Sequence, residues 1–235
     1  MNSFKGFSPE TFMLLELNRF NDSKDFYESV KEDIKKTAIL PMRALASDLA
    51  DELYKIDPLM NLVPTKMVSR IRRDTRFSKK KHLYRENVWC MFMRDKHSWS
   101  YQPCMWFEIY PGSYNYGVGM FRTDADYLEV FRKHLLENQQ QFKDALRMLE
   151  LTGAICHIES YKKAKPGAEL VDESLRAYYN CKEMMFVYSG RDVGRLYDGS
   201  ISQELVYALR AFTPMYRFLL EITEKIYKKG ELYEK

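Results

Sequence analysis

The sequence is poor in the residues that build cross-links and metal centres. Its 235 residues include four cysteines and four histidines, which are scattered without a C-x-x-C pair or an H-E-x-x-H spacing. Single cysteines in a chain of this length are typical of reduced thiols in a cytoplasmic protein, not of a secreted disulfide scaffold. We therefore expect neither a disulfide framework nor a metal site, and no motif calls for a cofactor.

Long apolar runs and a secretory leader are also missing. No run approaches the roughly 20 apolar residues that a bilayer-spanning helix needs. The opening residues 1–9 lack the apolar segment and the small-residue cleavage site of a signal peptide. The sequence thus predicts a cytoplasmic protein with no membrane partner, and it leaves the oligomeric state open.

The common catalytic and nucleotide-binding motifs are absent as well. There is no G-x-S-x-G elbow, no phosphate-binding P-loop and no dinucleotide glycine fingerprint. The S-x-x-K match at 78–81 lies inside a lysine run and lacks the motifs that accompany it in enzymes of that type. No sequence pattern therefore identifies a reaction, and whether the protein is an enzyme stays open.

What is present is enough apolar material for a large core, in an order that predicts the fold. Hydrophobic residues make up 46% and aromatic residues 14% of the chain. Helical periodicity covers 9–57, strand-like aromatic runs fill about 63–121, and helices with two late strands follow before a long helix from about Ser200. This order predicts a single α+β domain over residues 1–235, with a mainly antiparallel sheet, helices packed on one side, and helical N- and C-terminal segments.

A hairpin is predicted around the turn at 111–115, and its returning strand carries two glycines. Gly117 and Gly119 fall on one strand face because side chains alternate along a strand. They either leave a bare patch that a ligand or another backbone approaches, or make room for a large ring such as Trp89 or Trp106.

Positive charge is concentrated in one stretch of the chain. Residues 61–85 contain nine Lys or Arg and a single acid, Asp74, so this window carries +8 while the whole chain carries +4. If residues 68–77 are extended, Arg70, Arg72, Asp74 and Arg76 share one face. Such a cluster predicts a surface that binds phosphate or carboxylate, because guanidinium groups fork two hydrogen bonds onto either anion.

Three other interpretations of the stretch remain open. The arginines and Asp74 can form a structural network in an interaction protein, with the lysines simply solvated. Nucleic acid can be the anion, with nearby aromatic residues stacking on bases. An enzyme acting on a small phosphorylated substrate can use Glu108, Asp74 or Tyr84 as its acid or base.

The same stretch carries a family resemblance. The pattern Arg70-x-x-Arg73-Asp74-x-Arg76-Phe77-x-x-x-Lys81-x-x-Tyr84 resembles the signature of domain of unknown function 2461, a mostly bacterial family. The chain departs from this family at Lys80, where Asp or Asn is usual, and at Leu83, where Pro is common. The resemblance implies an α+β domain and no known activity. Combined with the charge argument, it makes the following our candidate ligand-binding set: Arg70, Arg73, Asp74, Arg76, Lys81 and Tyr84.

Overall fold

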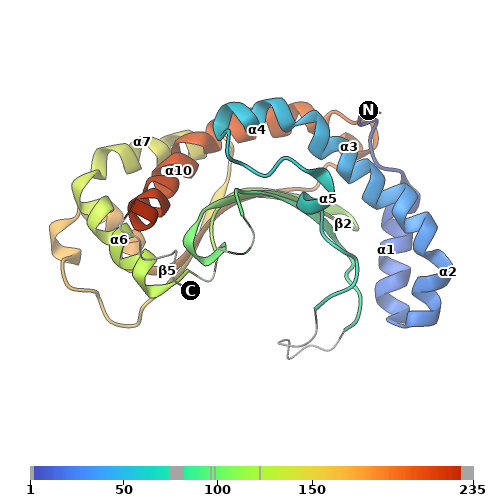
Figure 1. Cartoon of the computed structure of the whole chain (residues 1–235), viewed down its shortest axis with the longest axis horizontal. Helices are drawn as coiled ribbons and strands as arrows, with labels where there is room; N and C mark the ends of the chain where they lie inside the picture. The colour runs from blue at the N-terminus through green and yellow to red at the C-terminus, as the bar shows by residue number, and fades with distance from the viewer. Residues whose placement is uncertain (1–2, 75–81, 96, 98, 122, 229–235) are drawn as a thin grey trace. The chain divides into compact units, whose positions relative to one another are not determined.

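The computed structural model describes residues 3–74, 82–95, 97, 99–121 and 123–228, and it has an α+β fold (Figure 1). The described chain contributes five strands to one antiparallel sheet in the order β1-β2-β3-β5-β4. The strands are β1 (Val88–Phe92), β2 (Cys104–Tyr110), β3 (Ser113–Met120), β4 (Ile155–Ser160) and β5 (Cys181–Gly190). The predicted hairpin is confirmed as the β2–β3 pair, with Gly112 in the left-handed region at φ 78°.

Helices open and close the described chain, as the sequence predicts. The α-helices are α1 (Pro9–Asn21), α2 (Lys24–Ile34), α3 (Leu40–Asp48), α4 (Ala50–Ile56), α5 (Pro64–Met67), α6 (Ala125–Glu137), α7 (Gln139–Glu150), α8 (Arg176–Tyr179), α9 (Gly194–Tyr197) and α10 (Ile201–Lys228). Shorter turns are the π-helical η1 (Lys35–Ile39) and the 3-10 segments η2 (Trp99–Tyr101), η3 (Ala168–Leu170) and η4 (Glu173–Leu175).

The chain divides into two compact units. The first comprises Met1–Phe92, Trp106–Tyr116 and Ser189–Tyr207, and the second comprises Met93–Met105, Gly117–Tyr188 and Ala208–Lys235. Strands β2, β3 and β5 and helix α10 each contribute residues to both units. The single domain expected over residues 1–235 stays a prediction.

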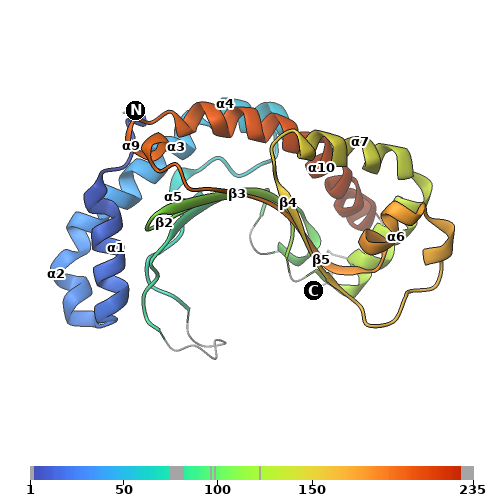
Figure 2. The ribbon, with the colours of Figure 1, turned by 180° about the vertical axis from the view of Figure 1, so that it is seen from behind.

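In the first unit, α1 and α2 form an antiparallel pair (Figures 1 and 2). Asp22 ends α1 in the left-handed conformation at φ 44°, and it is the one described non-glycine residue with a positive φ. Ser23 then caps α2, because its Oγ accepts a hydrogen bond from the Phe26 backbone N–H at 3.2 Å. Asp22 and Ser23 thus separate α1 from α2.

Exposure alternates along the part of the sheet that belongs to the first unit. Phe107 and Ile109 of β2 are fully buried, whereas Glu108 and Tyr110 are half-buried. Asn115 of β3 continues the half-buried side between two buried tyrosines. This alternation is typical of an antiparallel sheet whose two faces differ in their cover.

In the second unit, aromatic side chains of α6, α7 and α10 form the core. The ring of Phe142 lies 6.2 Å from that of Phe131 and 5.0 Å from that of Phe218, in edge-to-face geometry. Helix α6 begins after Asp124, not after Thr123. Asp124 is the capping residue, because its carboxylate accepts from the Asp126 backbone N–H at 3.3 Å.

Strands β4 and β5 pair side by side in the second unit, from Ile155 opposite Val187 (Figure 2). The backbone of β5 also explains Gly119 of β3. A Cβ atom at this position would overlap the carbonyl oxygen of Met184, so only glycine allows the two backbones this approach. Of the two interpretations of the glycine pair, Gly119 therefore fits the approach of another backbone.

Candidate functional site

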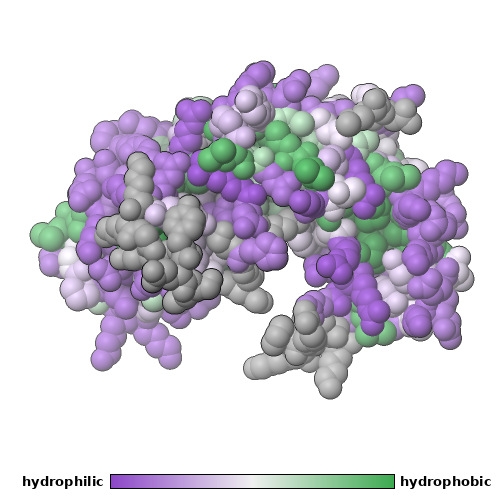
Figure 3. Space-filling view, in the orientation of Figure 1, coloured by the Kyte–Doolittle hydropathy of each residue, from purple (hydrophilic) through white to green (hydrophobic). Residues whose placement is uncertain are grey.

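The basic stretch contributes to both arms of an antiparallel ribbon in the first unit. Residues 68–73 pair with residues 83–90 through bridges at Val68–Cys90 and Arg72–Tyr84. The backbone N–H of Arg73 donates to the Leu83 carbonyl at 2.8 Å, and that of Arg85 donates to the Ile71 carbonyl at 3.0 Å. We call these two segments the signature ribbon, and Figure 3 shows hydrophilic side chains over its described part.

Side chains alternate along the first arm of the signature ribbon. Arg70, Arg72 and Asp74 are exposed, Ile71 between them is buried, and Arg73 is half-buried. The shared face predicted for Arg70, Arg72 and Asp74 thus corresponds to an exposed side, from which Arg73 is separated by the alternation. Arg76 and Lys81, the other two basic members of the predicted set, lie outside the described residues.

Asp22 fixes the second arm of the signature ribbon to the end of α1. Its Oδ1 accepts the backbone N–H groups of Leu83 at 2.8 Å and Tyr84 at 3.0 Å, and its Oδ2 lies 3.2 Å from Nδ1 of His82. Burial raises the pKa of the Asp22 carboxyl, but hydrogen bonds from Tyr84, His82 and Leu83 outweigh burial and leave this pKa lowered. The carboxylate is therefore held ionised, and it sets the position of residues 82–84.

Tyr84, a member of the predicted ligand set, is a packing residue. It is 2% exposed, and its ring stacks on that of Tyr27 of α2 with 4.6 Å between centroids. Burial raises the pKa of its hydroxyl, which keeps the phenol neutral. Its backbone bond to Asp22 and its stacked ring show how it holds the ribbon against α2.

Arg85, the next residue, has the most unusual environment of the ribbon. Its Nε is buried without a hydrogen-bond partner among the described residues, and its guanidinium carbon lies 5.8 Å from the centre of the Trp89 ring. Burial, followed by the positive charge of Arg73, lowers the pKa of Arg85, while Tyr110 acts in the opposite direction. Two guanidinium groups thus lie close enough to repel each other.

Glu108, a candidate acid or base, sits in a different hydrogen-bond network. Its Oε2 accepts from the Tyr110 hydroxyl at 3.0 Å and from Nδ2 of Asn87 at 3.2 Å, and its Oε1 accepts from Nδ2 of Asn115 at 3.1 Å. Burial, then the Glu108 charge, raises the pKa of Tyr110. Tyr110 of this network interacts electrostatically with Arg85. Tyr84, in contrast, contacts Asp22 at the end of α1 and Tyr27 of α2.

The structure therefore brings together a different set from the one predicted. Arg73 and Arg85 are neighbours, with Tyr110 and the Glu108 network beside them. Arg85 was counted in the basic window but left out of the candidate set, because it follows the last position of the family pattern. Its position beside the half-buried Arg73 depends on ribbon pairing, which spacing alone does not specify.

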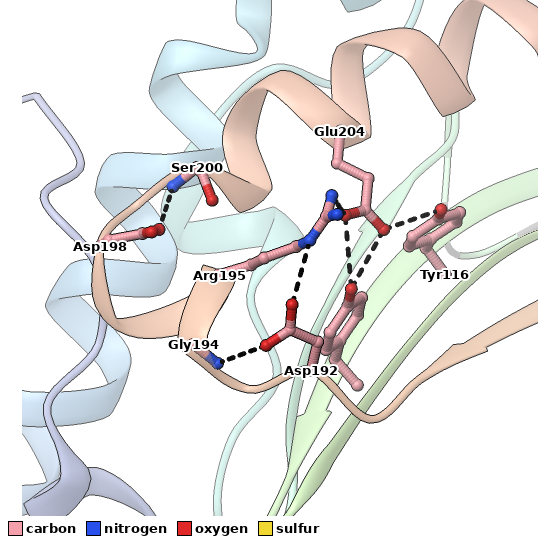
Figure 4. Close-up of polar contacts among 8 residues, drawn as sticks. Tyr116, Asp192, Gly194, Arg195, Asp198, Ser200 and Glu204 are labelled. Carbon is pink, nitrogen blue, oxygen red and sulfur yellow. Dashed lines mark hydrogen bonds and ion pairs between the residues drawn. The ribbon is translucent and has the colours of Figure 1, made fainter.

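A second polar cluster of the first unit was missed altogether (Figure 4). The carboxylate of Glu204, in the first turn of α10, accepts from the hydroxyls of Tyr114 at 3.1 Å and Tyr116 at 3.0 Å and from Nη1 of Arg195 at 2.7 Å. Nε of Arg195 also lies 3.5 Å from Oδ2 of Asp192. Glu204, through hydrogen bonding and charge, raises the pKa of Arg195. These hydrogen bonds and ion pairs hold α9 and the first turn of α10 against β3.

The described residues were compared with what a metal site and a membrane-spanning helix require. Within those ranges, no three His, Cys, Asp or Glu side chains gather as metal ligands would. No helix of the described chain is long and apolar enough to cross a membrane.

Comparison with known proteins identifies a family. Residues 10–218 match the model of the family described as conserved hypothetical protein (DUF2461), which covers most of the chain and includes the whole signature ribbon. A search of curated proteins finds no match. The chain therefore belongs to the family of domain of unknown function 2461, as its Arg–Asp–Lys–Tyr pattern indicates.

Proposed function

We propose that the protein binds a phosphate or carboxylate group on the signature ribbon, between Arg73 and Arg85. The observation that supports this proposal most strongly is the buried Nε of Arg85, a charged donor with no hydrogen-bond partner in the described chain. An unpaired buried donor costs free energy, and an anion would supply the missing acceptor.

The neighbouring charges favour the same ligand. Arg73 lies close enough to lower the pKa of Arg85, so an anion bound between them would replace repulsion by two attractions. A phosphate or carboxylate offers the paired oxygens that a guanidinium fork binds. Arg70 and Arg72 on the exposed side add positive potential that would attract an anion from solution. The buried Cys90, Cys104 and Cys181 form no disulfide, which supports a cytoplasmic location for this activity.

The proposal is tested by titrating the protein with phosphate and with citrate in a calorimeter. The double substitution Arg73→Gln and Arg85→Gln is expected to weaken binding at least tenfold, because charge-assisted hydrogen bonds contribute about 1.5–3 kcal/mol each. Arg191→Gln is a matched control on an exposed arginine of the same unit, and it should leave the affinity unchanged.

Two results would overturn anion binding at this position. One is equal affinity of the double variant and the unaltered chain for both ligands. The other is that the unaltered chain binds neither phosphate nor citrate but binds oligonucleotides with an affinity that falls steeply with salt. That result would make the ribbon a nucleic-acid-binding surface.

Replacing Asp74 distinguishes a ligand-binding role of the motif from a purely structural one. Because this carboxylate is exposed, Asp74→Ala is expected to change the free energy of unfolding by less than about 1 kcal/mol. Urea denaturation followed by tryptophan fluorescence measures this difference. A loss of several kcal/mol would instead support the structural Arg–Asp network.

A further inference from the structure

The segment that leaves β4 forms a basic pocket in the second unit. The pocket has a volume of about 570 Å³, within the range of small-molecule sites. Its lining comprises Tyr161, Lys162, Lys163, Ala164, Lys165, Pro166 and Lys182. Four of these residues are lysines and none is acidic, and Figure 3 shows mainly hydrophilic side chains over this segment.

Cations converge on Tyr161, at the start of this segment. Nζ of Lys165 lies 3.8 Å from the centre of the Tyr161 ring, the guanidinium carbon of Arg132 lies 5.4 Å away, and Nζ of Lys182 lies 5.5 Å away. The ring attracts each cation, but the three cations repel one another. Glu159 compensates Lys182 through an ion pair of 3.0 Å.

The guanidinium group of Arg132, beside the Tyr161 ring, uses only part of its hydrogen-bonding capacity within the described residues. Its Nε donates to the backbone carbonyl of Tyr179 at 3.1 Å. Its Nη2 is buried and has no hydrogen-bond partner in the part of the chain that the structure describes. The pocket lining therefore carries an excess of positive charge. Arg132 does not line the pocket but lies beside Tyr161, and it adds a buried donor with no acceptor among the described residues.

The basic segment is held in place before any ligand arrives. Nδ2 of Asn180 donates to the Tyr161 carbonyl at 3.0 Å, and Oδ1 of Asn180 accepts the Lys165 backbone N–H at 3.0 Å. The Tyr179 hydroxyl donates to the Pro166 carbonyl at 2.8 Å. Fixing both ends of the segment lowers the ordering cost of binding.

We propose that this pocket binds a compact polyanion with two or more phosphate groups, such as inorganic tripolyphosphate or the triphosphate of a nucleotide. Lysines act as point charges that suit several phosphates at once, and four of them line the pocket. A nucleic-acid strand would need open aromatic faces for base stacking, whereas Lys165 lies over the Tyr161 ring. The pocket is independent of the function proposed for the signature ribbon.

Calorimetric titration with inorganic tripolyphosphate tests this site. The double substitution Lys165→Gln and Lys182→Gln is expected to weaken binding at least tenfold. Lys133→Gln, which alters an exposed lysine on α6 paired with Glu129 at 2.7 Å, should leave binding unchanged. Circular dichroism of each variant establishes that it is folded before titration.

The Arg73→Gln and Arg85→Gln chain separates this pocket from the signature ribbon, since it should retain the tripolyphosphate binding that depends on Lys165 and Lys182. Loss of binding in that chain, with retention in the lysine variant, would assign the ligand to the ribbon and overturn the pocket. Absence of tripolyphosphate binding to the unaltered chain would overturn it too. Tighter binding of single-stranded DNA than of tripolyphosphate at 0.15 M salt would replace the small polyanion by nucleic acid.

Discussion

Glu204→Ala is expected to lower the free energy of unfolding by about 3 to 4 kcal/mol, the largest effect that we predict for a single substitution. The change removes the acceptor shared by Tyr114 and Tyr116, which are only 1% and 4% exposed. Two buried hydroxyls would lose the carboxylate acceptor that they share, and α10 would lose an acidic residue from its first turn, where the helix dipole favours one. Urea denaturation measures the loss.

Two companion variants show whether the buried hydroxyls cause the loss. Arg195→Gln should cost far less than Glu204→Ala, because half of the Arg195 side chain is exposed and exposed ion pairs contribute little. Tyr114→Phe, Tyr116→Phe and Glu204→Leu combined should recover most of the stability, since this change removes the two hydroxyl donors together with the acceptor they share. A triple variant as unstable as Glu204→Ala would contradict this account.

Asp22→Ala is expected to lower the free energy of unfolding by about 2 to 3 kcal/mol. The substitution removes the carboxylate that accepts two backbone N–H groups of the signature ribbon. It also places alanine at φ 44°, a region that asparagine and aspartate tolerate better. Hydrogen exchange should show faster exchange at Leu83 and Tyr84, and unchanged exchange there would refute the role of Asp22 as their anchor.

The pH dependence of stability offers a separate measurement on Asp22. Because its folded pKa is lowered from 3.8, the ionised carboxylate stabilises the fold above pH 3.8, and this contribution is lost as the pH falls through the folded value. Asp22→Asn keeps the side-chain shape and the left-handed preference but cannot ionise. The stability difference between the two chains should be constant above about pH 5 and shrink in acid. A stability difference that grows on acidification would contradict a lowered pKa of Asp22 in the folded chain.

Local sequence was sufficient for the elements that local interactions control. The break at 21–23 follows from polar residues that cap and end helices, and the β2–β3 hairpin follows from a glycine turn between aromatic runs. The alternation of Arg70, Ile71 and Arg72 follows from extended backbone alone. The family pattern was readable for the same reason, since it lies within fifteen consecutive residues.

Contacts between residues far apart in the sequence could not be predicted from local sequence patterns. Asp22 and Tyr84 are 62 positions apart, and Tyr114 and Glu204 are 90 apart. Neither pair belongs to a motif, because a carboxylate accepts from any donor that folding brings to it. The same holds for the ring of Tyr161, around which Arg132 of α6, Lys165 of a loop and Lys182 of β5 gather.

By itself, the sequence determined the α+β class, the helical ends, the family and the place where positive charge gathers. The tertiary structure alone decided which charged donors are buried without a hydrogen-bond partner in the described part of the chain. Charge density is a property of the chain, but the need for an anion depends on burial and on neighbours, which arise only when distant segments pack. That is why Arg85, which is not in the predicted set, carries the proposal for the signature ribbon, and why the lysines around Tyr161 carry the proposal for the pocket.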